Sequence, residues 1–371
     1  MAHEVSLVGQ TERVERTPRA LGYHMPAEWE RHEATWIAWP HNASDWPGKF
    51  GAIPWIYVEI VRLLAQGERV EILVRDERLE HRAMAMLRQA GVAMERVRFH
   101  RWRTNRVWLR DSGPIFVKNQ RGQVGATDWK FNAWAKYSDW RLDDQNPKRV
   151  AELLEIERWQ PIVRDAEGKD RRLVLEGGSI DVNGAGTLIT TEECLLSEVQ
   201  QRNPGVRREQ LEMAFAEYLG VEQVIWLGRG TAGDDTHGHV DDITRFVGKE
   251  TILTAVESNT SDENHQPLHE NLLRLRASRT PTGRQWNVIE LPMPRAVVCN
   301  GQRLPASYAN FYIANDRVLV PTFHDARDRE ALRILAEVFP EREIVGIHCV
   351  DFIWGLGALH CMTQQQPVAT V

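Results

Sequence analysis

Hydrophobic and polar positions along this chain form short strand-length runs, and pairs of these runs flank polar or glycine-containing turns. Four such turns lie at 118–122, 183–186, 248–250 and 315–317, roughly 65 residues apart, a pattern typical of β-hairpins. The alternation therefore predicts four antiparallel strand pairs at a regular spacing.

Each predicted hairpin is followed by a segment with the apolar periodicity of an α-helix, and then by another strand-like run. The clearest helical segments are Arg207–Leu219, Asn264–Ala277 and Asp325–Phe339. The strand-like runs after them are Val224–Leu227, Val288–Leu291 and Ile344–Ile347. The order hairpin, helix, strand is thus repeated along the chain.

The N-terminal part contains a less complete copy of this unit, with a strand at Thr35–Trp39, a helix at Trp55–Ala65 and a strand at Val70–Val74. Five copies at a regular period predict a repeat architecture closed into a ring. An ordinary open α/β sheet with antiparallel additions is the alternative. We expect residues 1–371 to form a single catalytic domain, with a loosely ordered extension at 1–21.

Composition narrows the class of protein. The 371 residues are 42% hydrophobic, enough for a sizeable core, and the net charge of −6 comes without a basic tract for nucleic acid. No apolar run approaches the roughly 20 residues of a membrane span, and no signal peptide is recognisable. Four scattered cysteines without a CxxC pair favour a reducing, cytoplasmic setting over a disulfide framework.

Cys361 is the candidate nucleophile. It follows the glycine-bounded stretch Gly355-Leu-Gly-Ala-Leu-His and precedes a run of amide side chains, a context in which a turned backbone can expose a thiol. The other cysteines, Cys194, Cys299 and Cys349, are interpreted as inert packing residues.

The segment His237-Gly-His239-Val-Asp241 admits two functional interpretations. In an extended strand the three polar side chains point to the same face, which is compatible with a metal site in a metal-dependent hydrolase. In the second interpretation His239 is a general acid and base, and Asp241 is a carboxylate that anchors a cationic substrate.

Three further residues have side chains suited to this chemistry. Glu176 ends an apolar strand, where its buried charge needs a donor, and a histidine is a natural one. Asp111 lies in a turn-forming sequence that by itself indicates only a local cap. Trp108 offers an aromatic wall for an alkyl-guanidinium. All these motifs fall at or just before hairpin strands, so a closed ring would gather them near its axis.

Together the motifs resemble those of the agmatine deiminase family, which includes the bacterial-type peptidylarginine deiminases. The resemblance extends from about Gly22 to Pro367. The motifs that carry it are Met25-Pro-Ala-Glu-Trp-Glu, Thr35-Trp-Ile-Ala-Trp-Pro-His, Trp108-Leu-Arg-Asp-Ser-Gly-Pro, Leu175-Glu-Gly-Gly-Ser-Ile, Thr190-Thr-Glu-Glu-Cys-Leu-Leu, Gly238-His-Val-Asp, Ser307-Tyr-Ala-Asn-Phe and His360-Cys-Met-Thr-Gln-Gln.

The resemblance implies a five-bladed pseudo-symmetric α/β propeller of ββαβ units. It also implies hydrolysis of agmatine to N-carbamoylputrescine and ammonia, without a metal or organic cofactor. By position, Cys361 matches the nucleophile, His239 the acid and base, and Glu176 the carboxylate that orients the histidine. The residues expected to bind substrate are Trp108, Asp111, Asp241, Asp235 and Asn310. A homodimer is expected by analogy.

Four residues depart from the family pattern and bear on the choice of substrate. Leu356 replaces a glycine, Asp235 a glutamate, His237 an aspartate and Asp242 an asparagine. Agmatine remains the leading substrate, with arginine or a terminal peptidyl arginine as alternatives. An amidinotransferase, the metal-dependent hydrolase and a silent guanidinium-binding protein are the competing functions.

Overall fold

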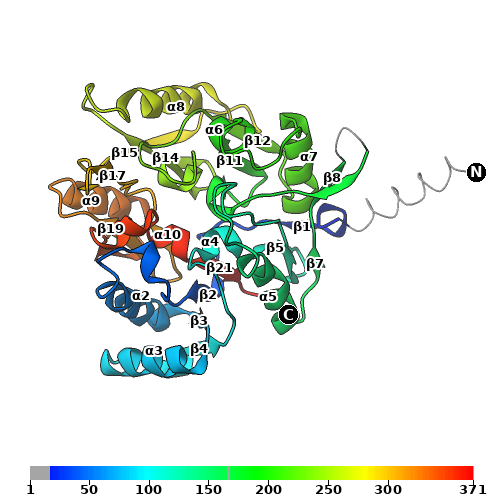
Figure 1. Cartoon of the computed structure of the whole chain (residues 1–371). Helices are drawn as coiled ribbons and strands as arrows, with labels where there is room; N and C mark the ends of the chain where they lie inside the picture. Colours follow the sequence, from blue (N-terminus) through cyan, green and yellow to red (C-terminus); the bar gives the residue numbers. More distant parts are fainter. Residues whose placement is uncertain (1–16, 165–167, 371) are drawn as a thin grey trace, which may run out of the picture.

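The computed structural model describes residues 17–164 and 168–370, which form a mixed α/β fold (Figure 1). Within these ranges, five sheets contain three or four strands each. The extension expected at 1–21 lies outside the described residues as far as residue 16. The described part of it includes a short 3-10 helix, η1 (Arg19–Leu21).

Three sheets share one arrangement, in which an antiparallel hairpin is followed by a helix and by a strand parallel to the second hairpin strand. The first contains β10 (Ile180–Val182), β11 (Thr187–Thr191), α7 (Arg208–Leu219) and β12 (Gln223–Leu227). The second contains β13 (Thr244–Gly248), β14 (Thr251–Val256), α8 (His265–Ala277) and β15 (Asn287–Pro292). The third contains β18 (Tyr312–Ile313), β19 (Arg317–Thr322), α9 (Asp328–Val338) and β20 (Glu343–His348). The predicted hairpins, helices and strands of these units are confirmed.

The other two sheets vary the arrangement. One contains β5 (Ile115–Asn119), β6 (Val124–Thr127), α5 (Asn146–Leu154) and β7 (Arg158–Trp159), with β1 (Tyr23–His24) antiparallel to β5. The other contains β2 (His32–Ala38), α2 (Ile53–Gly67), β3 (Arg69–Leu73), α3 (Glu77–Gln89), β4 (Val97–His100) and the C-terminal β21 (Gln364–Pro367). Because β21 pairs antiparallel with β2, the N-terminal unit receives its missing hairpin strand from the far end of the chain.

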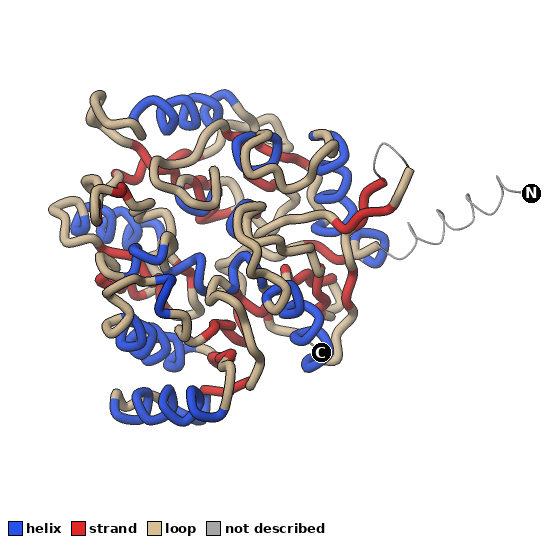
Figure 2. Tube along the Cα trace, in the orientation of Figure 1, coloured by secondary structure: helices blue, strands red, loops and turns tan. Residues whose placement is uncertain are grey.

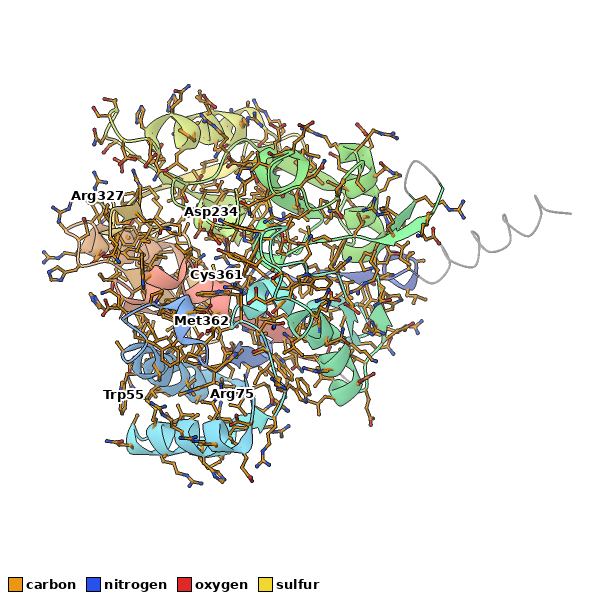
Figure 3. All side chains as sticks on the ribbon, in the orientation of Figure 1. Trp55, Arg75, Asp234, Arg327, Cys361 and Met362 are labelled. Carbon is orange, nitrogen blue, oxygen red and sulfur yellow. The ribbon has the colours of Figure 1, made fainter. Side chains whose placement is uncertain are left out.

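The long helices lie towards the outside of the molecule and the sheets lie further in (Figure 2). Helix α2 illustrates why: Tyr57, Val61 and Leu64 recur at helical spacing and are buried, whereas Trp55 on the opposite face is half exposed (Figure 3). Burying one large apolar side chain contributes about 1.5–3 kcal/mol. The amphipathic pattern thus fixes which face of the helix packs on the sheet.

One-turn helical segments lie just before one hairpin strand in each of four sheets. They are α4 (Leu109–Ser112) before β5, η5 (Gly177–Ser179) before β10, η6 (Val240–Asp242) before β13 and α10 (Leu359–Met362) before β21. Segment α4 packs against α10 and η5, and η5 packs against η6. Figure 1 shows α4 and α10 close to the centre of the molecule. The candidate motifs therefore meet, as their equivalent positions in the repeat predict.

The remaining elements lie in the connections within and between the five units. They are α6 (Glu192–Leu196), β8 (Ile162–Arg164), β9 (Asp170–Arg172), β16 (Val298–Cys299), β17 (Gln302–Arg303), η2 (Ala43–Asp45), η3 (Met94–Arg96), η4 (Asp143–Gln145) and η7 (Phe352–Gly355). Across 17–164 and 168–370, no helix combines the length and apolar character needed to cross a bilayer.

Candidate active site

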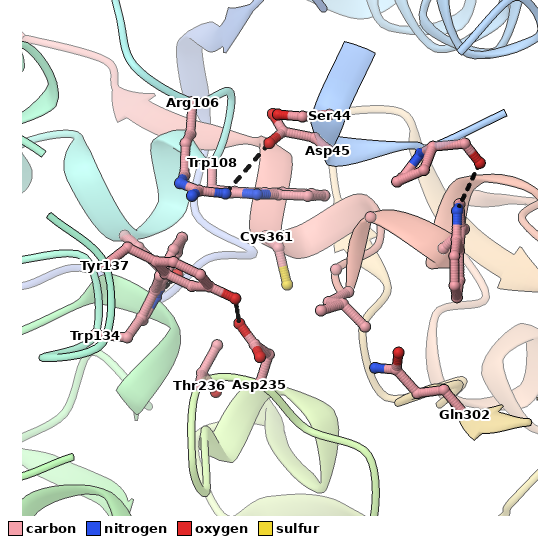
Figure 4. A pocket seen from close by; sticks show the side chains of 16 residues that line it. Ser44, Asp45, Arg106, Trp108, Trp134, Tyr137, Asp235, Thr236, Gln302 and Cys361 are labelled. Atoms are coloured by element: carbon pink, nitrogen blue, oxygen red, sulfur yellow. Dashed lines mark hydrogen bonds and ion pairs between the residues drawn. The ribbon is translucent and has the colours of Figure 1, made fainter. Parts of the chain in front are cut away.

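Cys361 on α10 borders a cavity of about 270 Å³. Its side chain is 6% exposed, and its sulfur points into the cavity (Figure 4). Asn310 Nδ2 donates a hydrogen bond to the sulfur at 3.1 Å, and Asp241 Oδ2 lies 3.8 Å from it. The thiol thus meets both the cavity and two polar groups behind it.

The loop before Cys361 approaches two aromatic rings closely. A Cβ added to Gly357 would lie 2.8 Å from the ring of Trp108, and one added to Gly355 would lie 2.5 Å from Trp46 Nε1. Between them Leu356 has a φ of 66°, which residues with a side chain seldom adopt. The two glycines permit the close approach, and Leu356 lines the cavity.

Aromatic side chains form much of the cavity wall. Trp108 lines it as predicted, together with Trp134 and Tyr137. Trp134 also donates its indole N–H to Asp111 Oδ2 at 2.8 Å. The sequence interpretation left Trp134 among the packing residues, because nothing in its flanking sequence indicates that its ring reaches the site.

Two more carboxylates line the cavity, and their hydrogen bonding differs. Asp235 accepts a hydrogen bond from Tyr137 Oη at 2.7 Å and pairs with Lys136 Nζ at 2.5 Å. Asp45 pairs with Arg106 through Oδ1 at 3.2 Å, but its buried Oδ2 accepts no hydrogen bond from the described residues. Burial raises the pKa of Asp45 to about 6, although Arg106 opposes the shift.

Asp111 and Asp241 face a common space beside His239. His239 Nδ1 lies 3.8 Å from Asp111 Oδ1 and 3.9 Å from Asp241 Oδ1. A Cβ added to Gly178 would lie 2.7–2.9 Å from atoms of all three side chains, and its backbone N–H donates to Asp111 Oδ1. Only a glycine leaves this space open, and Asp111 is more than the local cap that its own sequence indicates.

The His239 ring has no hydrogen bond at either nitrogen among the described residues, although it is 1% exposed. Burial opposes its charged form. Asp111, Cys194 and Glu176 nevertheless hold the pKa of this imidazole well above its ordinary value. These neighbours favour the imidazolium form of the ring, and Nδ1 is directed to the space between the two aspartates.

Glu176 lies on the other side of the ring, with Oε2 3.6 Å from His239 Nε2. The histidine expected beside this carboxylate is thus present, but the donor in hydrogen-bond contact is Arg202, whose Nε donates to both carboxylate oxygens at 3.1 and 3.3 Å. Burial alone would raise the pKa of Glu176, but Arg202 and His239 lower it below its ordinary value. Arg202 lies 26 residues further on, in a loop without a pattern that predicts this pairing.

His360, next to the candidate nucleophile, was missed by the sequence interpretation. Its Nδ1 lies 2.7 Å from Asp241 Oδ2, and its Nε2 lies 2.7 Å from Glu28 Oε2. The ring can donate to both carboxylates only when both nitrogens carry a proton. Glu28 also accepts from Arg245 Nη2 at 2.7 Å. A buried chain of hydrogen-bond contacts from Arg245 through Glu28 and His360 thus supports Asp241.

Comparison with known proteins identifies the family to which this site belongs. Residues 24–367 match the Porphyromonas-type peptidyl-arginine deiminase family. The chain belongs to this family. Agmatine deiminases of Ectopseudomonas mendocina and Pseudomonas syringae pv. syringae are 36% and 37% identical to it, over 95% of this chain and 97% of each relative. Membership makes the protein a hydrolase of C–N bonds in guanidino groups.

Solved structures of the family have the same fold. The agmatine deiminase of Enterococcus faecalis matches with a TM-score of 0.85 and 31% identity, over 95% of this chain and 98% of that one. An agmatine deiminase of C. jejuni, described with its substrate bound, matches with a TM-score of 0.81 and 28% identity, over 93% and 96%. The mixed α/β fold of this deiminase is therefore shared across nearly its whole length.

The metal interpretation of the His237–Asp241 segment is not supported in this deiminase. The expected extended strand is wrong, because His237 has a φ of 65° and residues 240–242 form η6. His237 Nε2 lies 3.3 Å from Ser197 Oγ instead. Among the described residues, the one group spaced to hold a metal ion combines His239 with Glu176 and Cys194.

Asn310 and Asp242 lie next to the thiol of this deiminase but away from the cavity. Asn310 belongs to a family motif, whereas Asp242 departs from the family pattern. Asn310 Nδ2 also donates to Asp242 Oδ1 at 2.9 Å, and neither residue lines the cavity. Burial raises the pKa of the Cys361 thiol well above its ordinary value, and Asp241, Asp242 and Asp111 raise it further. Burial and the three carboxylates thus all favour the neutral thiol over the thiolate.

Proposed function

We propose that this chain hydrolyses agmatine to N-carbamoylputrescine and ammonia, with Cys361 as the nucleophile. The observation that carries the proposal is a thiol at the cavity wall beside two carboxylates, with Cys361 Sγ 3.8 Å from Asp241 Oδ2 and Asp111 lining the same cavity. Relatives named agmatine deiminase over nearly the full chain support the choice of substrate.

The guanidinium binds between Asp111 and Asp241. Both carboxylates accept hydrogen bonds from its planar fork, which orients its carbon for attack. Asp241 Oδ1 is buried and accepts no hydrogen bond from the described residues, so it is available to the substrate. Trp108 and Trp134 flank the alkyl chain, and their rings favour a cation nearby.

The reaction proceeds in two halves. The thiolate of Cys361 adds to the guanidinium carbon, and His239 gives its proton to the departing nitrogen, which leaves as ammonia. An S-alkylthiouronium then joins the substrate carbon to the sulfur. His239, now neutral, takes a proton from water, whose oxygen adds to the same carbon. As the C–S bond breaks, the proton of the newly added hydroxyl is released to solvent, the ureido product leaves and the thiolate returns.

Glu176 and Arg202 position His239. The carboxylate faces Nε2 of the imidazole, so Nδ1 faces the substrate. Arg202 keeps Glu176 ionised and in place through two hydrogen bonds. The general acid and base thus keeps one orientation through both halves of the reaction.

His360 positions Asp241 in the same way. The ring is fixed between Glu28 and Asp241. Burial alone would raise the pKa of Asp241, but the hydrogen bond and the charge of His360 lower it below its ordinary value. Asp241 therefore remains a carboxylate, with one oxygen held by His360 and the other directed to the guanidinium.

The substrate completes the activation of Cys361. Its positive charge offsets the carboxylates that raise the pKa of the thiol, so binding increases the thiolate fraction. Ultraviolet titration of the thiolate with and without an unreactive guanidine tests this step. A lower pKa on binding supports substrate assistance, and an unchanged pKa rejects it.

A distal ammonium fits this cavity as well. Asp45 and Asp235 line it, and Asp45 Oδ2 has no hydrogen-bond donor among the described residues. Agmatine carries such an ammonium, whereas arginine adds a carboxylate at that end. This arrangement favours agmatine over arginine and over a terminal peptidyl arginine.

The five sheets are proposed to form the blades of one closed α/β propeller and a single catalytic domain. The pairing of β21 with β2, which joins the two ends of the chain, supports the closure. Assembly into a homodimer is the corresponding proposal for the quaternary structure, and sedimentation velocity tests it.

Ammonia release from agmatine, arginine and short arginine peptides tests the function directly. We expect the highest kcat/KM with agmatine and full activity after exhaustive chelation. Loss of activity in Cys361→Ser identifies the nucleophile. Transfer of the amidino group to an added amine in preference to water would instead indicate an amidinotransferase, and no turnover of any guanidine would indicate a binding protein.

A further inference from the structure

Cys194 lies beside the general acid and base, yet the proposed reaction does not use it. Its thiol belongs to a buried group with Glu176 and His239, whose ligand atoms all lie within 4.8 Å of one another. All three side chains are at most 1% exposed. The motif Thr190-Thr-Glu-Glu-Cys194 therefore contributes a third donor atom to the far face of the catalytic imidazole.

Local hydrogen bonds fix Cys194 in this position. It lies on α6, where Thr191 Oγ1 accepts a hydrogen bond from Cys194 N at 3.1 Å. The same hydroxyl donates to Gly238 O at 2.5 Å, next to His239. One threonine thus connects the segment that carries the thiol to the segment that carries the imidazole.

The spacing within the group suits a metal ion better than a hydrogen bond. His239 Nε2 and Glu176 Oε2 are 3.6 Å apart, and neither nitrogen of this buried ring has a hydrogen-bond partner among the described residues. In a tetrahedral zinc site with bonds of about 2.0–2.3 Å, neighbouring ligand atoms are roughly 3.3–3.6 Å apart. A small movement of the Cys194 thiol would complete three ligands.

We propose that Glu176, Cys194 and His239 bind a thiophilic divalent cation such as Zn²⁺ or Cd²⁺, and that the bound ion inhibits the enzyme. One thiolate sulfur, one imidazole nitrogen and one carboxylate oxygen form a donor set typical of zinc. The fourth position remains for water. The nucleophile Cys361 is not part of this site.

Binding of the ion exchanges protons for metal. Cys194 loses its thiol proton and His239 loses the proton from Nε2, so affinity rises with pH. The thiolate and the carboxylate together balance the two charges of the ion. Glu176 uses Oε2 for the metal, while Oε1 keeps its 3.1 Å hydrogen bond from Arg202.

The inhibitory effect follows from the role proposed for His239 and therefore rests on the proposed function. With Nε2 bound to the ion, the ring cannot exist as the imidazolium that protonates the departing ammonia. The binding itself depends only on the three side chains, so the two parts of the proposal are measured separately.

Binding is tested with Cd²⁺ as the probe, by the ultraviolet charge-transfer band of a sulfur–cadmium bond. The starting protein is Cys361→Ser, which removes the nucleophilic thiol. We expect one equivalent of Cd²⁺ to give the band in Cys361→Ser and in Cys361→Ser/Cys299→Ser, a matched control in which a half-buried thiol outside the site is replaced. The band should disappear in Cys361→Ser/Cys194→Ser. A band that persists in this last variant, or that is absent from Cys361→Ser, overturns the proposal.

A second variant keeps the binding test decisive if Cys194→Ser unfolds. In Cys361→Ser/Glu176→Gln the thiol remains but the carboxylate is lost, so Cd²⁺ affinity should fall at least tenfold. An unchanged affinity would show that Glu176 is not a ligand and would overturn the proposed site. Circular dichroism of each variant verifies the fold.

Inhibition is tested on the wild-type enzyme with Zn²⁺ and agmatine. Cys194→Ser should raise the Zn²⁺ concentration for half-inhibition at least tenfold, whereas Cys299→Ser should leave it unchanged. Equal sensitivity of Cys194→Ser and wild type would place the inhibitory ion elsewhere. If no variant turns over agmatine, the cadmium band still decides the binding site, so failure of the function and failure of the site are distinguishable.

Discussion

Two buried histidines, His239 and His360, face different oxygens of Asp241 and differ in the hydrogen bonding of their ring nitrogens. His239 has no hydrogen bond at either nitrogen, and the atoms around its ring lie 3.6–3.9 Å away. His360 has a carboxylate oxygen 2.7 Å from each nitrogen. Both rings are almost fully excluded from solvent, so burial alone does not distinguish them.

The difference indicates how this site divides its tasks. A side chain that must exchange protons and meet a substrate needs open nitrogens, whereas one that holds a charge in place needs both nitrogens occupied. Asp241 shows the same division within one carboxylate, because Oδ2 faces His360 while the buried Oδ1 has no hydrogen-bond partner among the described residues. Unpaired polar atoms thus mark the reacting side, and paired ones mark the support.

Replacing each histidine by glutamine gives the largest expected effects and tests this division. His239→Gln should lower kcat by about 10²–10⁴-fold and should destabilise the fold less than His360→Gln, because its ion pairs with the neighbouring carboxylates are 3.6–3.9 Å long rather than 2.7 Å. His360→Gln should destabilise the fold by roughly 3–5 kcal/mol, the usual consequence of breaking a buried ion pair, and should raise KM through Asp241.

Denaturant unfolding and steady-state kinetics on the same preparations measure both effects. Glu28→Gln serves as the matched variant, since it weakens the support without touching the cavity or Asp241 directly. It should raise KM more than it lowers kcat. A stable His360→Gln enzyme with an unchanged KM would remove the assigned difference between the two rings.

Gly178→Ala should have the next largest effect, because it fills the open space on the His239 side. The added methyl group would lie 2.7–2.9 Å from His239, Asp111 and Asp241, where a guanidinium must fit. A displacement of about 1 Å at a reacting centre can lower the rate about 100-fold, so kcat/KM should fall by this order. Gly51→Ala is the control, since its added Cβ meets nothing within 4 Å. Similar kinetics in both variants would contradict the assignment of this space.

Much of this fold can be predicted from the sequence. Within the site, the residues proposed to react with the substrate are predicted better than the residues that position them. The turns at 118–122, 183–186, 248–250 and 315–317 are confirmed because short polar turns between alternating strands leave few other structures. The repeated order of elements also places Asp111, Glu176, His239 and Cys361 at equivalent points. Their side chains belong to motifs in which the residue type alone predicts the chemistry.

The residues that position the reacting groups cannot be predicted from sequence in this way. Arg202, Glu28 and His360 act through partners 26 to 332 residues away, and neither local periodicity nor spacing encodes such pairs. The error at His237 has a different origin. Alternation predicts a strand, but the left-handed backbone at His237 and the positive φ of Gly238 turn the chain before η6.

The pH dependence of the reaction is a smaller expected effect. The acid limb of kcat/KM reports the free enzyme, and that of kcat reports the enzyme–substrate complex. Burial, together with Asp241 and Glu176, raises the pKa of Asp111 to about 6, although His239 opposes the shift. Below this pH Asp111 is protonated and cannot hold a cation, so kcat/KM should fall about tenfold per pH unit on the acid side. Bound guanidinium favours the ionised form, so the acid limb of kcat should lie at lower pH. Asp45 has a similar pKa of about 6, and Asp45→Asn should leave both limbs in place if Asp111 causes them.

The contrast between unpaired and paired atoms recurs at Asp45 and Asp235, which also line the cavity and where the smallest effect is expected. Asp45 has an oxygen without a donor, whereas both oxygens of Asp235 are engaged by Tyr137 and Lys136. We therefore expect Asp45→Asn to raise KM for agmatine by about tenfold, in line with one hydrogen bond to a charged group. Asp235→Asn should raise it less. Butylguanidine, which lacks the distal ammonium, is the control substrate, and Asp45→Asn should not change its KM. An equal rise in KM for both substrates would mean that Asp45 only holds Arg106 in place. Unpaired polar atoms would then identify substrate contacts only beside Cys361.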